Sequence, residues 1–210
     1  MLALIRKELI NIYNGTFIFL ITIFSIGLLK TSWDAISAVI AITFLIGFKN
    51  LDNDRKVNMD VILNSLPVSR AKIIIGKYIA FYLYLLLGFI LLISLSKIVD
   101  YFFADFKFQM IDFNLKVFLA GSIIWSIYIS IYLPISILIK VQVTQYICGF
   151  MFVIFIPYLF KYITNENITP GAWLMKQPPS SLIMILAISL IIVMASCAFL
   201  YAIYRRKELF

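Results

Sequence analysis

Histidine is absent from the 210-residue chain, charged residues make up only 13% of it, and it has just two cysteines. Without histidine the chain lacks the commonest general base, and histidine-containing zinc sites and catalytic triads are excluded. Cys148 and Cys197 both lie within apolar runs, so we interpret them as buried free thiols rather than a disulfide or a metal pair. The scarcity of charge argues against a soluble domain, in which about 25% of residues are charged.

Apolar residues make up 63% of the chain, which is more than a water-soluble fold could bury. A membrane-spanning helix needs about 20 mostly apolar residues. We predict an all-α, polytopic membrane protein in which residues 1–210 form a single transmembrane domain. Its six expected spans are 13–29, 34–48, 73–96, 117–139, 145–163 and 181–204. The run 34–48 is short, but Trp33 can lie at the interface and Lys30 and Asp34 in the headgroup region.

Lysine and arginine are distributed unevenly around these spans. If both termini and the loops 49–72 and 140–144 are cytoplasmic, 12 of the 18 basic residues lie inside and 6 outside. This asymmetry agrees with the positive-inside rule, and it is lost if the short span 34–48 is omitted. We therefore expect both termini in the cytoplasm. We also attribute the net charge of +8 to topology, and expect no nucleic-acid partner.

The first twelve residues have the pattern of an amphipathic helix lying in the membrane interface. Leu2, Ile5 and Leu9 recur at helical spacing, whereas Arg6 and Lys7 lie elsewhere on the helical wheel. The alternative is a cleaved signal peptide, but no convincing small-residue cleavage site follows the apolar stretch.

A second amphipathic pattern lies in the cytoplasmic loop, within residues 52–68. Four apolar residues fall on one face of a predicted short helix over 55–66: Met59, Ile62, Leu63 and Leu66. Pro67 ends this helix, because the residue before a proline is disfavoured in helical conformation, and Ser69 can cap the next span. The pattern fits either a surface helix resting on lipid headgroups or a helix that docks another protein.

Gly76 and Lys77 are similar to the end of a phosphate-binding loop, G-x-x-x-x-G-K-[ST]. That motif needs glycine where Ala71 stands and serine or threonine where Tyr78 stands, and it follows a strand rather than opening an apolar helix. We therefore exclude a nucleotide site, expect no enzyme activity and no directly bound cofactor, and predict that Lys77 extends to the cytoplasmic surface.

Three serines form a stripe on the predicted span 117–139: Ser122, Ser126 and Ser130. Small residues at this spacing favour close helix packing, and a face that lines a substrate path is the alternative. Pro134 and Pro157 are expected to kink their spans. No acidic residue lies in the middle of a predicted span, which argues against a proton- or sodium-coupled transporter.

The segment Ser65-Leu66-Pro67-Val68-Ser69-Arg70, followed by Lys77-Tyr78 at the start of an apolar span, resembles the membrane subunits of type-2 ATP-binding-cassette (ABC) exporters. The similarity is greatest to small bacterial permeases of this length with the signature "SLPVSR", which include exporters of phenol-soluble modulins. It extends over the whole chain, although only residues 52–78 are specific. Many larger relatives carry Gly-Thr where this chain has Asn58 and Met59.

The resemblance implies a role for the predicted cytoplasmic helix, which in such families is the coupling helix that fits a groove on the ATPase subunit. The implied docking residues are Met59, Ile62, Leu63, Leu66, Pro67, Val68 and Arg70. ATP and magnesium would bind to the separate ATPase, and a second permease chain, identical or related, would complete the transporter.

We therefore expect the transmembrane subunit of an exporter in the bacterial cytoplasmic membrane, in contact with lipid. Few charges and many Ile, Leu and Phe residues favour a hydrophobic or amphipathic cargo, and the resemblance favours a peptide. The alternative is a non-transporting membrane scaffold or peptide-immunity protein, which would need no ATPase partner.

Overall fold

The computed structural model describes residues 32–56, 69–102, 114–138 and 170–206, and every secondary-structure element within these ranges is a helix. The helices are α3 (Ser32–Lys56), α5 (Arg70–Phe102), α6 (Leu115–Leu138), α8 (Pro170–Lys176) and α9 (Pro179–Arg206). The predicted interfacial helix 1–12 and the spans 13–29 and 145–163 lie outside the described residues.

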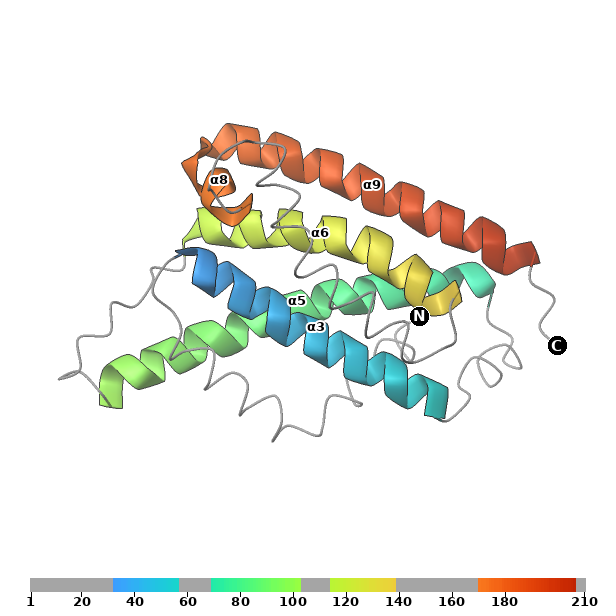
Figure 1. Ribbon diagram of the computed structural model, residues 1–210, viewed down its shortest axis with the longest axis horizontal. Coiled ribbons are helices and arrows are strands. Elements are labelled where there is room, and N and C mark those ends of the chain that lie inside the picture. The colour runs from blue at the N-terminus through green and yellow to red at the C-terminus, as the bar shows by residue number, and fades with distance from the viewer. Residues whose placement is uncertain (1–31, 57–68, 103–113, 139–169, 207–210) are drawn as a thin grey trace.

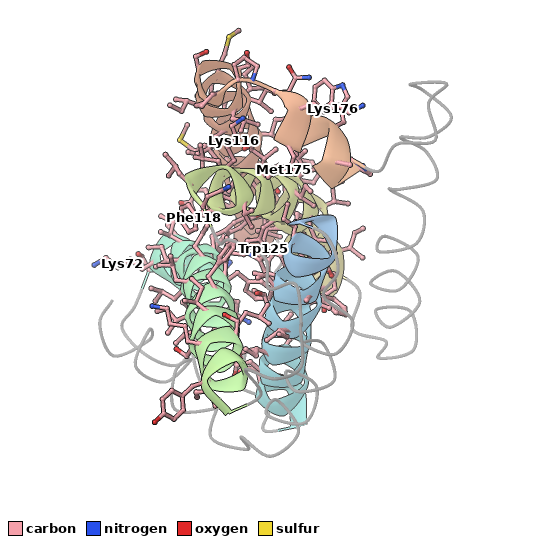
Figure 2. The ribbon with its side chains drawn as sticks, turned by 90° about the vertical axis from the view of Figure 1, so that its left-hand side faces the viewer. Lys72, Lys116, Phe118, Trp125, Met175 and Lys176 are labelled. Carbon is pink, nitrogen blue, oxygen red and sulfur yellow. The ribbon has the colours of Figure 1, made fainter. Side chains whose placement is uncertain are left out.

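The four long helices form a layered bundle. Figures 1 and 2 show α3 and α5 next to each other, α6 over both, and α9 along the outer side of α6. The short α8 packs against α6 and α3. In Figure 1, α3, α6 and α9 run in one direction and α5 in the opposite one. This is the relative orientation that the predicted order of spans requires.

Three described helices are long and apolar enough to cross a membrane: Arg70–Ile98, Leu115–Leu138 and Pro179–Ile203. The first contains the whole predicted span 73–96. The second contains the predicted span 117–139 except its last residue, and the third contains the predicted span 181–204 except its last residue. The helix predicted at 34–48 is present as part of α3, which continues eight residues further, to Lys56. α3 is not among the three helices that are long and apolar enough to cross a membrane. The first residues of the predicted coupling segment, 52–56, are therefore the last turn of this helix.

One helix start was not predicted, and another agrees with the prediction. Pro170 begins α8 within the expected outer loop 164–180, where proline suits the first helical position because no helical partner exists for an N–H group there. Ser69 directly precedes α5, and its carbonyl accepts hydrogen bonds from the backbone N–H groups of Lys72 (2.9 Å) and Ile73 (3.4 Å). The start of α5 at Arg70 agrees with the expected cap position of Ser69.

Aromatic rings fill the core between α3, α5 and α6. Trp125 of α6 stacks on Phe81 of α5, with ring centroids 6.1 Å apart, and on Tyr128, at 5.2 Å. Tyr132 continues the stack at 5.2 Å from Tyr128, and Phe44 of α3 meets both tyrosines edge-on at 5.5 Å. Figure 2 shows Trp125 pointing from α6 toward the other two helices. The spacing 125, 128, 132 places the three α6 rings on one helical face.

Glycine allows α3 and α5 to approach closely at two levels. A Cβ atom on Gly47 of α3 would lie 2.7 Å from the Phe81 ring, and one on Gly88 of α5 would lie 2.7 Å from Thr43 Oγ1. Real Cβ atoms do not come this close to other heavy atoms, so a larger residue at either position would force the facing side chain or the helices themselves to shift.

The outer face of α9 is apolar and exposed in the single chain. Only 17% of the most apolar stretch of α9 is buried, compared with 72% of the corresponding stretch of α6. The exposed residues include Ile183, Met184, Ile188, Ile191, Met194 and Phe199. Such a face is suited to contact with lipid or with another membrane subunit.

Candidate functional site

The end of the bundle where α3 ends and α5 begins is rich in basic residues, and we call it the basic end. The helix turns at this end contain Arg55 and Lys56 of α3, Arg70 and Lys72 of α5, and Arg205 and Arg206 of α9. Figure 1 shows that α6 also ends here. The basic end therefore adjoins residues 57–68, which contain most of the predicted docking residues.

Six of the seven predicted docking residues, Met59, Ile62, Leu63, Leu66, Pro67 and Val68, lie outside the described residues. Arg70 is the first residue of α5 and is partly buried. Two residues later, Lys72 is exposed, and Figure 2 shows it pointing away from the bundle. No acidic residue lies in the first turn of α5, so all charged side chains in the turn that follows the predicted coupling segment are positive.

A buried ion pair joins the two helices on either side of residues 57–68. Lys77 Nζ lies 3.7 Å from Asp54 Oδ2, and the two side chains are only 10% and 6% exposed. The expectation that Lys77 extends to the cytoplasmic surface is therefore wrong. The reason is that α3 continues past residue 48 and brings a carboxylate to Lys77, which compensates for the loss of water around the ammonium group.

A second polar contact lies further along the same helix pair, where Asn50 Nδ2 of α3 donates a hydrogen bond to the Tyr84 hydroxyl of α5. Both residues are buried. Together with the close approaches at Gly47 and Gly88, these contacts fasten α3 to α5 over several turns. We call this pair of helices the α3–α5 hairpin.

The three serines of the predicted stripe are all buried in α6. Ser126 Oγ donates to the Ser122 carbonyl at 2.7 Å, and Ser130 Oγ donates to the Ile127 carbonyl at 2.7 Å. The Tyr82 hydroxyl of α5 lies 2.7 Å from Ser126 Oγ. Because the hydroxyl hydrogen of Ser126 is already used within α6, Tyr82 is the donor in this bond.

A similar contact joins α5, α6 and α9. Ser196 Oγ of α9 donates to the Ser130 carbonyl at 2.5 Å, and the Tyr78 hydroxyl of α5 lies 2.8 Å from Ser196 Oγ. The sequence did not predict these contacts of Tyr78, Tyr82 or Ser196. For the two tyrosines, the available signal was their i, i+4 spacing in a mostly apolar span, which also contains Tyr84.

Two apolar grooves lie on either side of α9. One, of about 440 Å³, is lined by the first turns of α5 and the last turns of α9, with Tyr78, Tyr82 and Cys197 among its residues. The other, of about 500 Å³, lies between α6 and α9 and is lined by Pro134 and Phe199 among others. Cys197 is a free thiol and is half-buried, while Cys148 lies outside the described residues.

Comparison with known families identifies the chain. The sequence model of the ABC-2 family transporter proteins matches residues 3–205, nearly the whole chain. The chain belongs to the ABC-2 transporter family. No curated protein and no solved structure matches it.

Membership of the ABC-2 family makes this chain a multi-pass membrane protein and a permease component of an ABC transporter. Such components are generally non-catalytic, and the family implies an ABC ATPase as partner. The resemblance noted at residues 52–78 is confirmed at the level of the ABC-2 permease family.

Proposed function

We propose that this ABC-2 permease is the transmembrane subunit of an ATP-driven exporter, and that the α3–α5 hairpin receives the movement of the ATPase. The observation that carries the proposal is the buried Asp54–Lys77 ion pair. It ties together the two helices that lead into and out of residues 57–68, so a force applied to that segment acts on both helices at once.

The ATPase docks on the apolar face of the predicted coupling helix, formed by Met59, Ile62, Leu63 and Leu66. Pro67 is the pivot between this helix and α5, Val68 belongs to the docking surface, and Arg70 contacts acidic groups of the ATPase. The cationic first turn of α5 supports this role, because its charges oppose the helix dipole and an acidic partner would offset that cost.

The complete transporter consists of two permease chains with two ATPases beneath them, and ATP and magnesium bind to the ATPases. Each permease chain has six spans, with both termini in the cytoplasm of a bacterial cell. α6 ends at the basic end and α8 begins at the opposite end, which is the placement expected if a span at 145–163 lies between them. ATP-driven closure of the ATPases switches the helix bundle between inward-open and outward-open states.

The cargo is an amphipathic or hydrophobic molecule, and we propose a peptide that enters from the bilayer. Support comes from the apolar lining of both grooves beside α9 and from the apolar outer faces of the described helices. Deleting the gene should reduce secretion of a membrane-active peptide and increase the cell's sensitivity to it. If neither quantity changes, a peptide cargo is refuted.

Co-purification of the permease with its candidate ATPase tests the docking part of the proposal. Leu63→Asp should abolish complex formation and the stimulation of ATP hydrolysis, because it places a charge on the docking face. The matched control is Leu115→Asp, a leucine 67% exposed at the start of α6, at the opposite end of the bundle, which should leave both intact. A complex that survives Leu63→Asp overturns the docking face, and a permease that functions with no ATPase favours the scaffold alternative.

A further inference from the structure

Pro134 leaves a gap in the hydrogen-bond ladder of α6. It lies inside the helix, and proline has no backbone N–H group. In a regular helix the N–H of residue 134 would donate to the carbonyl of Ser130. The Ser130 carbonyl therefore lacks its helical donor in a buried part of a membrane span, where an unsatisfied carbonyl is costly.

Ser196 of α9 closes this gap from outside α6. Its hydroxyl donates to the Ser130 carbonyl at 2.5 Å, across 66 residues of sequence. A serine hydroxyl has one hydrogen, and a carbonyl can only accept, so the hydrogen of Ser196 lies on this bond. The Tyr78 hydroxyl, 2.8 Å from Ser196 Oγ, must then be the donor to Ser196. The hydrogen bonds run from α5 to α9 to α6, and we call this arrangement the three-helix junction.

The helices have space to move next to the junction. The groove between α5 and α9 lies on one side, and the groove between α6 and α9 lies on the other. Tyr78 lines the first groove, and Ser130, Pro134 and Ser196 line the second. At this level close apolar packing is incomplete, so the hydrogen bonds contribute more to holding the three helices together than they would in a filled core.

Ser196 also has a second partner available. A serine in a helix can donate to the carbonyl three or four residues earlier in its own helix. Five other serines in the described helices do so; for example, Ser126 donates to the Ser122 carbonyl at 2.7 Å, and Ser189 of α9 donates to the Leu186 carbonyl at 2.8 Å. Rotation of the Ser196 side chain would therefore exchange the bond to α6 for a bond within α9 without leaving its hydroxyl unsatisfied.

We propose that Ser196 is a positioning residue that links movement of α5 to bending of α6 at Pro134. The structure has the junction closed. When α5 shifts, Tyr78 withdraws from Ser196, Ser196 turns to its own helix, and α6 becomes free to bend at Pro134. The closed junction follows from the contacts alone, whereas its use in transport rests on the proposed function.

A double-mutant cycle on the full chain in detergent tests the closed junction. Ser196→Ala should raise the equilibrium constant for unfolding by about 3- to 20-fold, the range of single hydrogen bonds in membrane proteins. In the Pro134→Ala background the Ser130 carbonyl regains its own donor, and Ser196→Ala should cost less than about 2-fold. An equal effect in both backgrounds overturns the proposal.

Two further variants make the stability test specific. Ser196→Thr keeps the hydroxyl group and should restore most of the lost stability. Ser189→Ala removes a hydroxyl that bonds only within α9 among the described contacts, so its effect should be the same with and without Pro134. A Ser189→Ala effect that also depends on Pro134 would show that the coupling is not specific to the junction, and would overturn it.

Hydrogen exchange of the amides of residues 135–138 tests the switch in the permease–ATPase complex. A non-hydrolysable ATP analogue should speed this exchange at least 3-fold in the wild type. In Ser196→Ala, and also in Tyr78→Phe, which removes the hydroxyl group that holds Ser196 in the junction, the exchange should already be fast without nucleotide. If no ATPase binds, the proposed function fails and the stability cycle still stands. If the ATPase binds and nucleotide leaves wild-type exchange unchanged, the switch is overturned.

Discussion

Breaking the buried ion pair of the α3–α5 hairpin should destabilise the bundle more than any change to an exposed charge. Lys77→Met leaves Asp54 buried without the ammonium group 3.7 Å away, and Asp54→Asn leaves Lys77 without its carboxylate. At this distance the attraction is about 4 kcal/mol for an effective dielectric constant of about 20. Removing one partner of a buried pair typically costs about 3–5 kcal/mol, so we expect each single variant to lose about that much.

The double variant separates the ion pair from the two side chains taken singly. With both charges removed, no uncompensated charge remains from this pair, so Asp54→Asn with Lys77→Met should cost less than about 2 kcal/mol. The coupling energy between the two positions should then exceed about 2 kcal/mol, well above the range for independent sites. Reversible unfolding of the full chain in mixed detergent micelles, followed by circular dichroism, gives all four free energies.

Lys72→Met is the matched control for this cycle. It removes a lysine from the first turns of the same helix, but Lys72 is exposed, and its loss should change stability by less than about 0.5 kcal/mol. Free energies for Asp54→Asn and Lys77→Met that simply add in the double variant would refute the reasoning, because the two side chains would then not stabilise each other.

Three further substitutions test the packing of the bundle by the same unfolding measurement. Gly47→Ala should cost about 1–3 kcal/mol, because the new methyl group would collide with the Phe81 ring. Trp125→Phe should cost about 2–3 kcal/mol, because the smaller ring leaves a cavity in the core and the indole Nε1 no longer donates to the Phe81 carbonyl, 3.1 Å away. Tyr82→Phe should cost about 0.6 kcal/mol, through loss of its hydrogen bond to Ser126.

Each of these expectations has an outcome that contradicts it. A neutral Gly47→Ala would mean that α3 and α5 do not approach as closely as described. An effect of Tyr82→Phe that persists unchanged in a Ser126→Ala background would show that its hydroxyl acts elsewhere. For Trp125→Phe, a change in stability no larger than that of an exposed aromatic such as Tyr101→Phe would exclude a role for the indole N–H.

Three of the described helices could be predicted well because each is encoded by a continuous apolar run of the sequence. Runs of about 20 apolar residues need no knowledge of the rest of the fold, so the spans 73–96, 117–139 and 181–204 follow from composition alone. The same holds for the start of α5, which a serine and the change from polar to apolar residues indicate.

The helix ends were predicted less accurately where charged residues or a proline occur within a helix. Lys49 and four charged residues between 52 and 56 follow residue 48, so the predicted span ends there, although the helix continues to Lys56. Asp54 is accommodated there by Lys77, 23 residues further on, and a hydropathy window cannot detect that contact. Pro170 lies between the predicted spans 145–163 and 181–204, where a loop was expected, but it occupies the first position of α8.

For the candidate site, the sequence predicted which residues share a face of one helix, but not which residues of other helices they contact. The serine stripe was found from its spacing, and the structure places all three serines in the interior of the single chain. The partners Tyr82 and Ser196 come from helices 44 and 66 residues away in sequence from their contacts on α6. Which face of α5 or α9 meets α6 depends on how the whole bundle packs, so one helical pattern does not determine it.

The contact between Ser196 and Ser130 also bears on how the protein is made. At about 5–20 residues per second, a ribosome needs about 3–13 s to synthesise the 66 residues that separate them. During that interval α6 has been made, but the carbonyl exposed by Pro134 has no donor from α9. The last described helix thus completes an earlier one, and α6 reaches its final hydrogen bonding in the membrane only after α9 has been inserted.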